Sequence, residues 1–347
     1  MSYLIGIDVG GTNTNGVLLQ GSTILATAKA ATDHGHLRDG TRQAMTELLK
    51  ALPQKRAGEV TLHLSTTLAT NAIVEGKGDP TAVMIIPGPG LRWQNFQTAF
   101  KLYPVSGYID HRGREAGPLD LAEVRGVLTA IQEAGSQALA VVGKFSPRNF
   151  QHELAIERLI RDEFPGLFPV TLGHRLSGRL NFPRRITTAA LNASIARLQE
   201  EFVRMVQEVK DQYKLGRIYL MKADGGTLAL EESVHRSIET ILSGPAAGLM
   251  GTMALTEQLA EAVVLDIGGT TTEISVFSGT EPLTEREGAV IAGYPTLVPA
   301  FFSRSIGLGG DSAVTYDGNR VKIGPQRAGP PVALGGARVT PTDAVVV

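Results

Sequence analysis

The chain has 347 residues, about two domains' worth, and its composition excludes several classes of site before any motif is considered. It contains no cysteine, which excludes disulfides, iron–sulfur clusters, thiolate zinc sites and cysteine nucleophiles. Its 33 basic and 34 acidic residues leave a formal net charge of −1, so no basic field attracts a nucleic acid or an anionic membrane. No run approaches the ~18 apolar residues of a membrane span, and no basic leader precedes the first strand pattern. We therefore expect a soluble, cytoplasmic protein.

Short apolar runs alternate with helical periods, which predicts an α/β fold. The expected strands cover residues 4–9, 17–19, 60–64, 82–86, 138–142, 169–172 and 217–221. The expected helices cover residues 44–52, 121–133, 150–163 and 186–214. The last helix has no internal Gly or Pro, so we interpret it as the joint between two lobes, residues 1–181 and 182–347. Residues 87–118, which are rich in Gly, Pro, Tyr and Arg, favour a long excursion or lid.

An internal repeat is the most informative feature of the sequence. Residues 8–15, Asp-Val-Gly-Gly-Thr-Asn-Thr-Asn, recur as residues 266–273, Asp-Ile-Gly-Gly-Thr-Thr-Thr-Glu, 258 positions later (266 minus 8). Each copy follows one apolar strand pattern and precedes another, so both are expected to be hairpin turns. Five of the eight positions are identical, which favours a duplicated fold with two facing loops over two unrelated glycine turns.

The residue types in these loops suit the phosphates of a nucleotide. Glycine lets backbone N–H groups approach an anion, and threonine hydroxyls add further donors. An aspartate at the end of the incoming strand suits direct or water-mediated binding of Mg²⁺, so Asp8 and Asp266 are the candidate catalytic and metal-binding residues. ATP and Mg²⁺ are the expected ligands. The candidate ATP-binding residues are Gly10, Gly11, Thr12, Asn13, Gly268, Gly269, Thr270, Thr271, Gly309, Gly310 and Asp311.

Two further segments each allow a functional and a purely structural interpretation. Residues 306–312 are a third glycine cluster, which either approaches a purine and its ribose or forms an ordinary capped turn. Thr66, Thr67 and Asn71 lie between an expected strand and an expected helix, where they either cap the helix or line a substrate cleft. Both interpretations stay open for each segment.

Two other segments favour structural roles. Ser243 and Pro245 start a helix, and the small residues that follow favour close packing. An arginine cluster precedes the long helix, and we interpret it as a solvated or ion-paired face, although arginine also orients carboxylates bidentately. Its members are Arg175, Arg179, Arg184 and Arg185.

Together these segments resemble the hydantoinase/oxoprolinase family within the sugar kinase and actin superfamily. The resemblance spans essentially the whole chain and rests on residues 6–14, 65–72, 75–78, 243–248, 266–273 and 305–312. It implies a two-lobed, actin-like (ribonuclease H-like) ATPase fold with a duplicated phosphate-loop hairpin. It also implies ATP-dependent opening of a cyclic amide or imide of the hydantoin or 5-oxoproline type, in which phosphate from ATP activates the ring carbonyl oxygen for attack by water. Thr66, Thr67 and Asn71 would then bind the substrate, and a second hydantoinase-type subunit or an oligomer is the implied partner.

The chain departs from the family's pattern in three respects. Asn15 and Glu273 stand where the family usually has Asp, and Leu64 and Ser65 replace its His-Gly pair. The chain also stops at Val347, in a valine run that favours a strand, where relatives continue. We therefore expect the 347-residue chain alone to be a poor or inactive catalyst. A small-molecule kinase on the same fold and a non-catalytic ATP-binding subunit are the alternatives.

Overall fold

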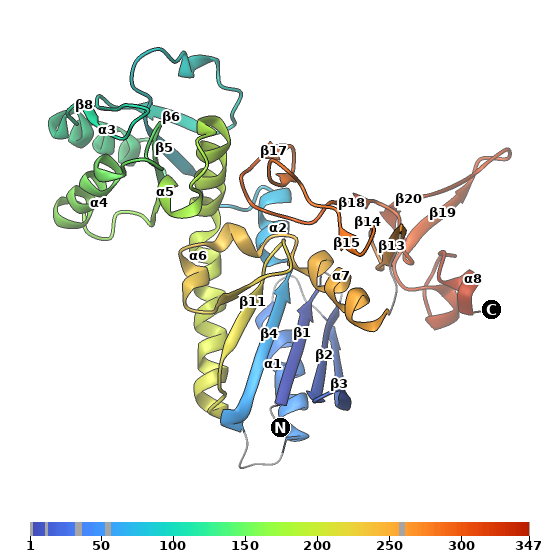
Figure 1. The fold of residues 1–347 in the computed structure, drawn as a ribbon. Helices are drawn as coiled ribbons and strands as arrows, with labels where there is room; N and C mark the ends of the chain where they lie inside the picture. The colour runs from blue at the N-terminus through green and yellow to red at the C-terminus, as the bar shows by residue number, and fades with distance from the viewer. Residues whose placement is uncertain (1–2, 11–12, 32–36, 53–56, 257–260, 347) are drawn as a thin grey trace.

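The computed structural model describes residues 3–10, 13–31, 37–52, 57–256 and 261–346. It has a mixed α/β fold with three larger sheets, and the strands of the second sheet lie in sequence between β4 (Val60–Thr66) and β11 (Ile218–Met221) of the first (Figure 1). Three two-stranded hairpins and several helices complete the part that the structure describes. No helix in these ranges is both long and apolar enough to cross a membrane.

The largest sheet has six strands in the order β12-β11-β4-β1-β2-β3. These strands are β1 (Tyr3–Val9), β2 (Asn13–Gln20), β3 (Thr23–Ala31), β4 (Val60–Thr66), β11 (Ile218–Met221) and β12 (Thr227–Ala229). β1 pairs antiparallel with β2 and parallel with β4. Ile5 and Ile7 of β1 share one buried core with Met45 of α1 (Leu37–Lys50) and Val206 of α6 (Phe182–Tyr213).

The second sheet is parallel throughout and has the order β10-β9-β5-β6. Its strands are β5 (Thr81–Ile86), β6 (Lys101–Pro104), β9 (Ala138–Gly143) and β10 (Val170–Leu172). One face packs on α3 (Leu121–Glu133) and α4 (Gln151–Glu163), and the other packs on the N-terminal half of α6. Because both faces are covered, β5 and β9 are apolar almost without interruption.

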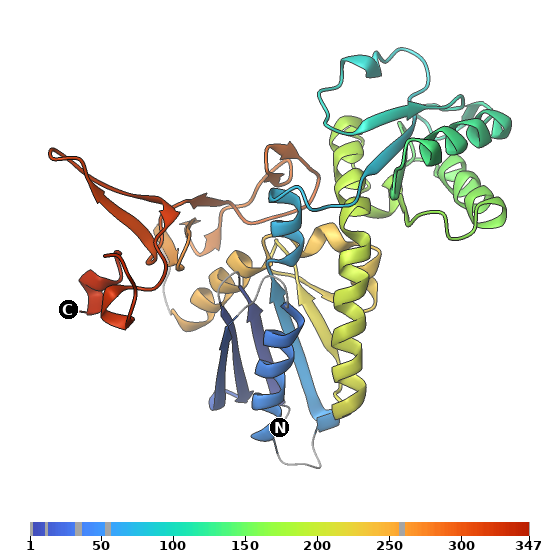
Figure 2. The ribbon, with the colours of Figure 1, turned by 180° about the vertical axis from the view of Figure 1, so that it is seen from behind.

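Helix α6 connects the two sheets: its first half packs on the second sheet and its second half on the largest one (Figures 1 and 2). It has 32 residues and begins four residues before the predicted position, because Asn181 caps it and Pro183 fits its first turn. The division proposed between residues 181 and 182 coincides with this cap. β11 and β12, which follow that division, pair within the largest sheet.

The third sheet contains the second copy of the repeat. Its strands are β13 (Ala262–Ile267), β14 (Thr272–Ser278), β15 (Glu281–Pro282) and β18 (Ser303–Ile306). Helix α7 (Ser243–Leu255) precedes it in the chain. The hairpins β16 (Val290–Ile291) with β17 (Tyr294–Pro295) and β19 (Ser312–Tyr316) with β20 (Val321–Arg327) flank it (Figure 1).

The predicted elements are present with small shifts, and two predictions need correction. Residues 87–118, predicted as an excursion, contain the edge strand β6 and a hairpin of β7 (Tyr108–Ile109) with β8 (Glu115–Gly117), because the run Lys101–Pro104 pairs in parallel with β5. The valine run near the end is helical instead of extended, in α8 (Asp343–Val346). There the Asp343 carboxylate accepts N–H groups from Thr340 and Ala333 and fixes a turn. The remaining short helices are α2 (Leu68–Val74), α5 (Gly173–Leu176) and the 3-10 turns Ala57–Glu59, Trp93–Asn95, Glu232–Val234, Ser237–Thr240 and Val332–Leu334.

Candidate functional site

The two copies of the repeat line one cavity, whose volume is about 440 Å³. Asp8 and Gly10 come from the first loop, and Asp266, Gly268 and Thr271 come from the second. Gly11 and Thr12 of the first loop lie outside the described residues. A cavity of this size falls within the range of small-molecule sites, and it brings together chain segments that are far apart in sequence.

The two hairpins have the same strand register. Asp8 lies opposite Asn15 in the β1–β2 pair, and Asp266 lies opposite Glu273 in the β13–β14 pair. The repeat in the sequence is therefore also a repeat in the backbone. The two positions that depart from the usual aspartate, 15 and 273, are the ones that face the two loop aspartates.

The first described glycine of each loop, Gly10 and Gly268, has little room for a side chain. Gly10 N–H donates to the Asn13 carbonyl at 3.1 Å, and Gly268 N–H donates to the Thr271 carbonyl at 2.9 Å. A Cβ at Gly10 would lie 3.1 Å from that Asn13 oxygen, and one at Gly268 would lie 3.3 Å from the Thr271 oxygen. Each loop is thus a tight backbone turn of the kind that presents N–H groups to an anion.

Asp8 sits in an environment that is short of positive charge. Burial raises the pKa of its carboxyl group, the hydrogen bond from Ser65 lowers it, and the negative charge of Asp266 raises it again. The Ser65 hydroxyl donates to Asp8 Oδ1 at 2.6 Å. A divalent cation at this position would supply the missing charge.

The donor set also fits Mg²⁺ in particular. No group of three or more His, Asp or Glu side chains within the described ranges is placed to enclose a metal ion. Mg²⁺ rarely uses such a cage, because it is held by one or two carboxylates together with substrate phosphates and water. Asp8 and Asp266, which line the same cavity, match that requirement.

The third glycine cluster packs directly behind the second loop. Gly310 N–H donates to the Gly268 carbonyl at 2.9 Å, and Asp311 N–H donates to the Gly269 carbonyl at 2.7 Å. The Asp311 carboxylate forms an ion pair with Arg327 at 2.7 Å. The cluster therefore braces the loop from behind. The candidate ATP-binding residues of the described ranges that do not line the cavity are Asn13, Gly269, Thr270, Gly309, Gly310 and Asp311.

Thr66, Thr67 and Asn71 line the cavity and also stabilise the local structure, although not as the helix cap that one interpretation expected. Thr66 Oγ1 accepts the N–H of Leu68, but the N-cap residue of α2 is Thr67, which makes no side-chain cap hydrogen bond. Thr67 Oγ1 donates to the Val9 carbonyl and accepts from the Asn71 amide. All three side chains contribute to the cavity wall.

The start of α7 was predicted as a packing element, but it also contributes to the cavity. Ser243, Gly244 and Pro245 are part of the wall, and a Cβ at Gly244 would lie 3.5 Å from Asp8 Oδ1. The Ser243 hydroxyl accepts the N–H of Thr66 and donates to its carbonyl, both at 3.1 Å. Ser243 does not cap the helix, because its hydroxyl bonds the backbone of Thr66; the N-cap residue is Leu242, which makes no side-chain cap hydrogen bond.

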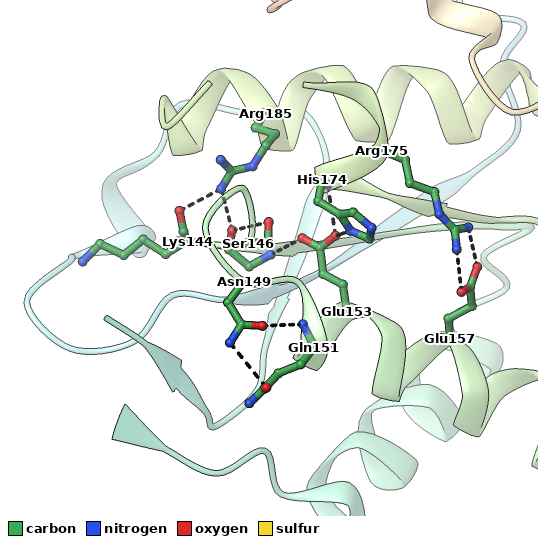
Figure 3. A network of polar contacts seen from close by, with 10 residues as sticks. Lys144, Ser146, Asn149, Gln151, Glu153, Glu157, His174, Arg175 and Arg185 are labelled. Carbon is green, nitrogen blue, oxygen red and sulfur yellow. Dashed lines mark hydrogen bonds and ion pairs between the residues drawn. The ribbon is translucent and has the colours of Figure 1, made fainter. Parts of the chain in front are cut away.

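The arginine cluster is a solvated or ion-paired face, as its sequence interpretation expects, except at Arg185, which is fully buried; Figure 3 shows Arg175 and Arg185. Arg175 forms a two-pronged ion pair with Glu157, and Arg179 donates to the Arg286 carbonyl. Arg184 donates to backbone carbonyls of residues 287, 288 and 296. Arg185 is fully buried, donates to the carbonyls of residues 143 and 144, and has its pKa lowered to about 10 by burial. None of the four lines the cavity.

Two family models match the chain. The model of the hydantoinase/oxoprolinase N-terminal region matches residues 4–164, and the hydantoinase/oxoprolinase model matches residues 185–347. Among curated proteins, the acetophenone carboxylase gamma subunit of Aromatoleum aromaticum is 27% identical over 99% of this chain and 52% of its own length. Caprolactamase subunit alpha of Pseudomonas jessenii is 25% identical over 98% of this chain and 53% of its own. The 5-oxoprolinase 1 of Arabidopsis thaliana is 24% identical over 82% of this chain and 26% of its own.

Two solved structures share the fold. Nucleotide-free acetone carboxylase superposes with a TM-score of 0.79 at 19% identity, covering 94% of this chain and 51% of that one. The ATP-dependent caprolactamase from Pseudomonas jessenii superposes with a TM-score of 0.76 at 23% identity, covering 99% of this chain and 54% of that one. The chain therefore spans about half the length of the relatives that it matches most fully.

Proposed function

Because this chain belongs to the hydantoinase/oxoprolinase family, we propose that it binds Mg²⁺·ATP between its two Asp-x-Gly-Gly-Thr loops and uses it to open a cyclic amide or imide. The observation that supports this most directly is the shared cavity, which residues of both loops line. We infer an actin-like arrangement of two lobes, with the hairpins β1–β2 and β13–β14 on either side of the nucleotide.

Each loop has a defined role in this proposal. The backbone N–H groups around Gly10 and Gly268 would bind phosphate oxygens, and Asp8 and Asp266 would hold the metal. Mg²⁺ would neutralise charge on the phosphates as the phosphoryl group moves. Ser65, through its 2.6 Å hydrogen bond, keeps one oxygen of Asp8 in a fixed place. The protein's contribution is thus positioning and electrostatics.

The ring would bind beside the hydroxyl and amide groups at the end of β4 and the start of α2. Its carbonyl oxygen would take the γ-phosphoryl group as ADP leaves, and water would then attack the carbonyl carbon. The carbon–nitrogen bond breaks and the nitrogen takes a proton from the water, which leaves an acyl phosphate. A second water then hydrolyses the acyl phosphate to the acid and free phosphate. The start of α7 lies beside Asp8. The positive end of its helix dipole would therefore lie near the negative charge of the phosphoryl group that is transferred.

The chain is expected to work inside a larger assembly. Two of its relatives are named as subunits, a gamma subunit and a subunit alpha, and the chain spans about half of each. We therefore propose a second hydantoinase-type subunit as its partner. We also expect residues 1–347 alone to turn over ATP poorly, because the third sheet is open to water on one side.

Calorimetry with Mg²⁺·ATP on the assembled enzyme tests the nucleotide site. Asp8→Ala and Asp266→Ala are expected to weaken binding at least tenfold, because each removes a ligand of the metal. Asp162→Ala, which removes an exposed aspartate of α4, is the matched control and should bind as the parent does. If both loop variants bind Mg²⁺·ATP as tightly as the parent, the proposed site is wrong.

Product analysis separates the hydrolase from a small-molecule kinase on the same fold. A hydrolase yields ADP, free phosphate and a ring-opened acid from a hydantoin or lactam. A kinase yields ADP and a stable phosphorylated product. Accumulation of such a product, with no ring opening, would replace the proposed function by the kinase.

A further inference from the structure

We propose that the substrate ring carries no negative charge of its own, so that the enzyme opens neutral lactams or imides and discriminates against rings bearing a carboxylate. This inference rests on the proposed function and narrows its substrate class. Hydantoin-type and 5-oxoproline-type rings are both compatible with the family. They differ in that 5-oxoproline carries a carboxylate, so the charges around the cavity favour one type over the other.

The charged side chains of the cavity wall are all acidic. Asp8, Asp266 and Glu273 line it, and no lysine, arginine or histidine does so among the described residues. Bound Mg²⁺·ATP would add further net negative charge. A substrate carboxylate would therefore enter a cavity without a partner for it.

The arginines of the cluster near the start of α6, which the sequence offers as carboxylate ligands, already bind other groups of the protein. Arg184 binds three backbone carbonyls of the segment around β16, and Arg185 is buried against the end of β9 (Figure 3). Arg175 is paired with Glu157. Moving any of them into the cavity would break hydrogen bonds to charged groups, which cost about 1.5–3 kcal/mol each.

Part of the cavity wall is apolar. Val74 of α2, Leu242 at the start of α7, and Val290 and Ile291 of β16 contribute to its wall. Asn71 donates its amide N–H to Thr67, and its carbamoyl oxygen accepts no hydrogen bond from the described residues. That oxygen is therefore free to accept the N–H of a cyclic amide. The combination suits a small neutral ring with hydrocarbon edges.

Three probes with the same five-membered lactam ring test the inference on the assembled enzyme. They are 2-pyrrolidinone, 5-oxoproline and the methyl ester of 5-oxoproline, and ATP-dependent ring opening is measured for each as kcat/KM. The neutral lactam and the ester are expected to exceed 5-oxoproline at least tenfold, because an unpaired charge is costly to bury. The ester separates the effect of charge from that of size.

Charge variants of the wall provide a second, independent measurement. Val74→Lys and Val290→Lys place an ammonium group at the apolar part of the wall, and both residues are more than half exposed, so the fold should tolerate them. Each should lower the dissociation constant of 5-oxoproline relative to that of 2-pyrrolidinone at least tenfold, because only 5-oxoproline carries a carboxylate that the ammonium group can pair with. Leu121→Lys on α3, outside the cavity, is the control and should change neither.

The outcomes distinguish the inference from its premise. Ring opening of 5-oxoproline at or above the rate of 2-pyrrolidinone, with no response to Val74→Lys or Val290→Lys, would overturn the inference and leave the proposed function standing. A failure of all three probes and of the hydantoins to be opened by an enzyme that binds Mg²⁺·ATP would overturn the proposed function itself, and the inference with it.

Discussion

The two loop hairpins have the same backbone and opposite surroundings. Ile5, Ile7 and Val9 of β1 are at most 3% exposed. Their counterparts 258 positions later in β13 are Val263, Leu265 and Ile267, and these are 56–64% exposed. In both cases the three side chains lie on one face of the strand. The first face is covered by α1 and α6, and among the described elements none covers the second face.

The difference shows that the repeat specifies the turn and the strand register of each hairpin but not its burial. The tight turn and the strand register follow from local residues, so both copies form them. Burial depends on which other elements pack on the hairpin, and the repeat does not contain those elements. An apolar row that is more than half exposed has the composition of an interface, which agrees with a chain that spans about half of its relatives.

The largest expected effect concerns the stability of the two hairpins. Ile7→Ala should lower the free energy of unfolding by about 2–5 kcal/mol, because it leaves a cavity in a packed core. Leu265→Ala, the matched change in the second copy, should lower it by less than ~0.5 kcal/mol in this chain alone. Urea denaturation of both variants measures the difference. Equal losses would show that the second face is covered within residues 1–347, contrary to the comparison.

The two loops are also braced differently, which predicts an intermediate effect. The first loop is held by the side chains of Ser65, in β4, and Thr67, which directly follows it, whereas the second loop accepts backbone hydrogen bonds from Gly310 and Asp311. A Cβ at Gly309 would lie 2.6 Å from the Gly268 carbonyl oxygen, which cannot move without the loop. Gly309→Ala should therefore weaken Mg²⁺·ATP binding about tenfold or more, as measured by calorimetry.

A glycine in open space supplies the control for this change. Gly251 lies on α7 with no atom near the place of a Cβ. Gly251→Ala should leave nucleotide affinity unchanged and stabilise the helix by up to about 1 kcal/mol. If Gly309→Ala also left the affinity unchanged, the bracing of the second loop would be irrelevant to the nucleotide.

Much of the fold and of the site follows from local sequence. Helix α3 has the predicted bounds because Asp120 caps it and its apolar residues repeat with a helical period. The repeat placed Asp8 and Asp266 in one site, and the structure has them in one cavity. Both conclusions depend on residues that are close in sequence or identical in pattern.

The rest depends on contacts between distant residues, which no local pattern contains. Ser243 bridges to the backbone of Thr66 across 177 positions, so its place beside Asp8 is visible only in the fold. Val290 and Ile291 form a two-residue strand whose sequence indicates no cavity wall. The edge strand β6 is not predicted, because it lies in a segment rich in Gly and Pro. It is formed by its pairing with β5 and not by the strand propensity of its own residues.

The smallest expected effect tests the one position where the repeat differs in charge. Asn15 lies opposite Asp8, whereas Glu273, a carboxylate, lies opposite Asp266 and accepts a hydrogen bond from Ser303. Side chains directly opposite each other on antiparallel strands lie on one face with their Cβ atoms about 4.5–5.5 Å apart. Asn15→Asp therefore puts a second negative charge beside a carboxylate that already lacks compensation.

The added negative charge should destabilise the protein without Mg²⁺·ATP and should favour ATP hydrolysis when Mg²⁺·ATP is bound. Without Mg²⁺·ATP, Asn15→Asp should lower the free energy of unfolding by about 0.2–1 kcal/mol, the usual cost of like charges in facing positions. With Mg²⁺·ATP bound, the added carboxylate attracts the cation, so ATP hydrolysis by the assembled enzyme should rise a few-fold. Asn15→Ala removes the amide without adding charge and should not raise turnover, while Glu273→Gln should reduce it. The two hairpins share one strand register, so position 15 should be coupled to Asp8. An Asn15→Asp variant that changes neither stability nor turnover would show that it is not. The two loops would then be equivalent in their backbone only.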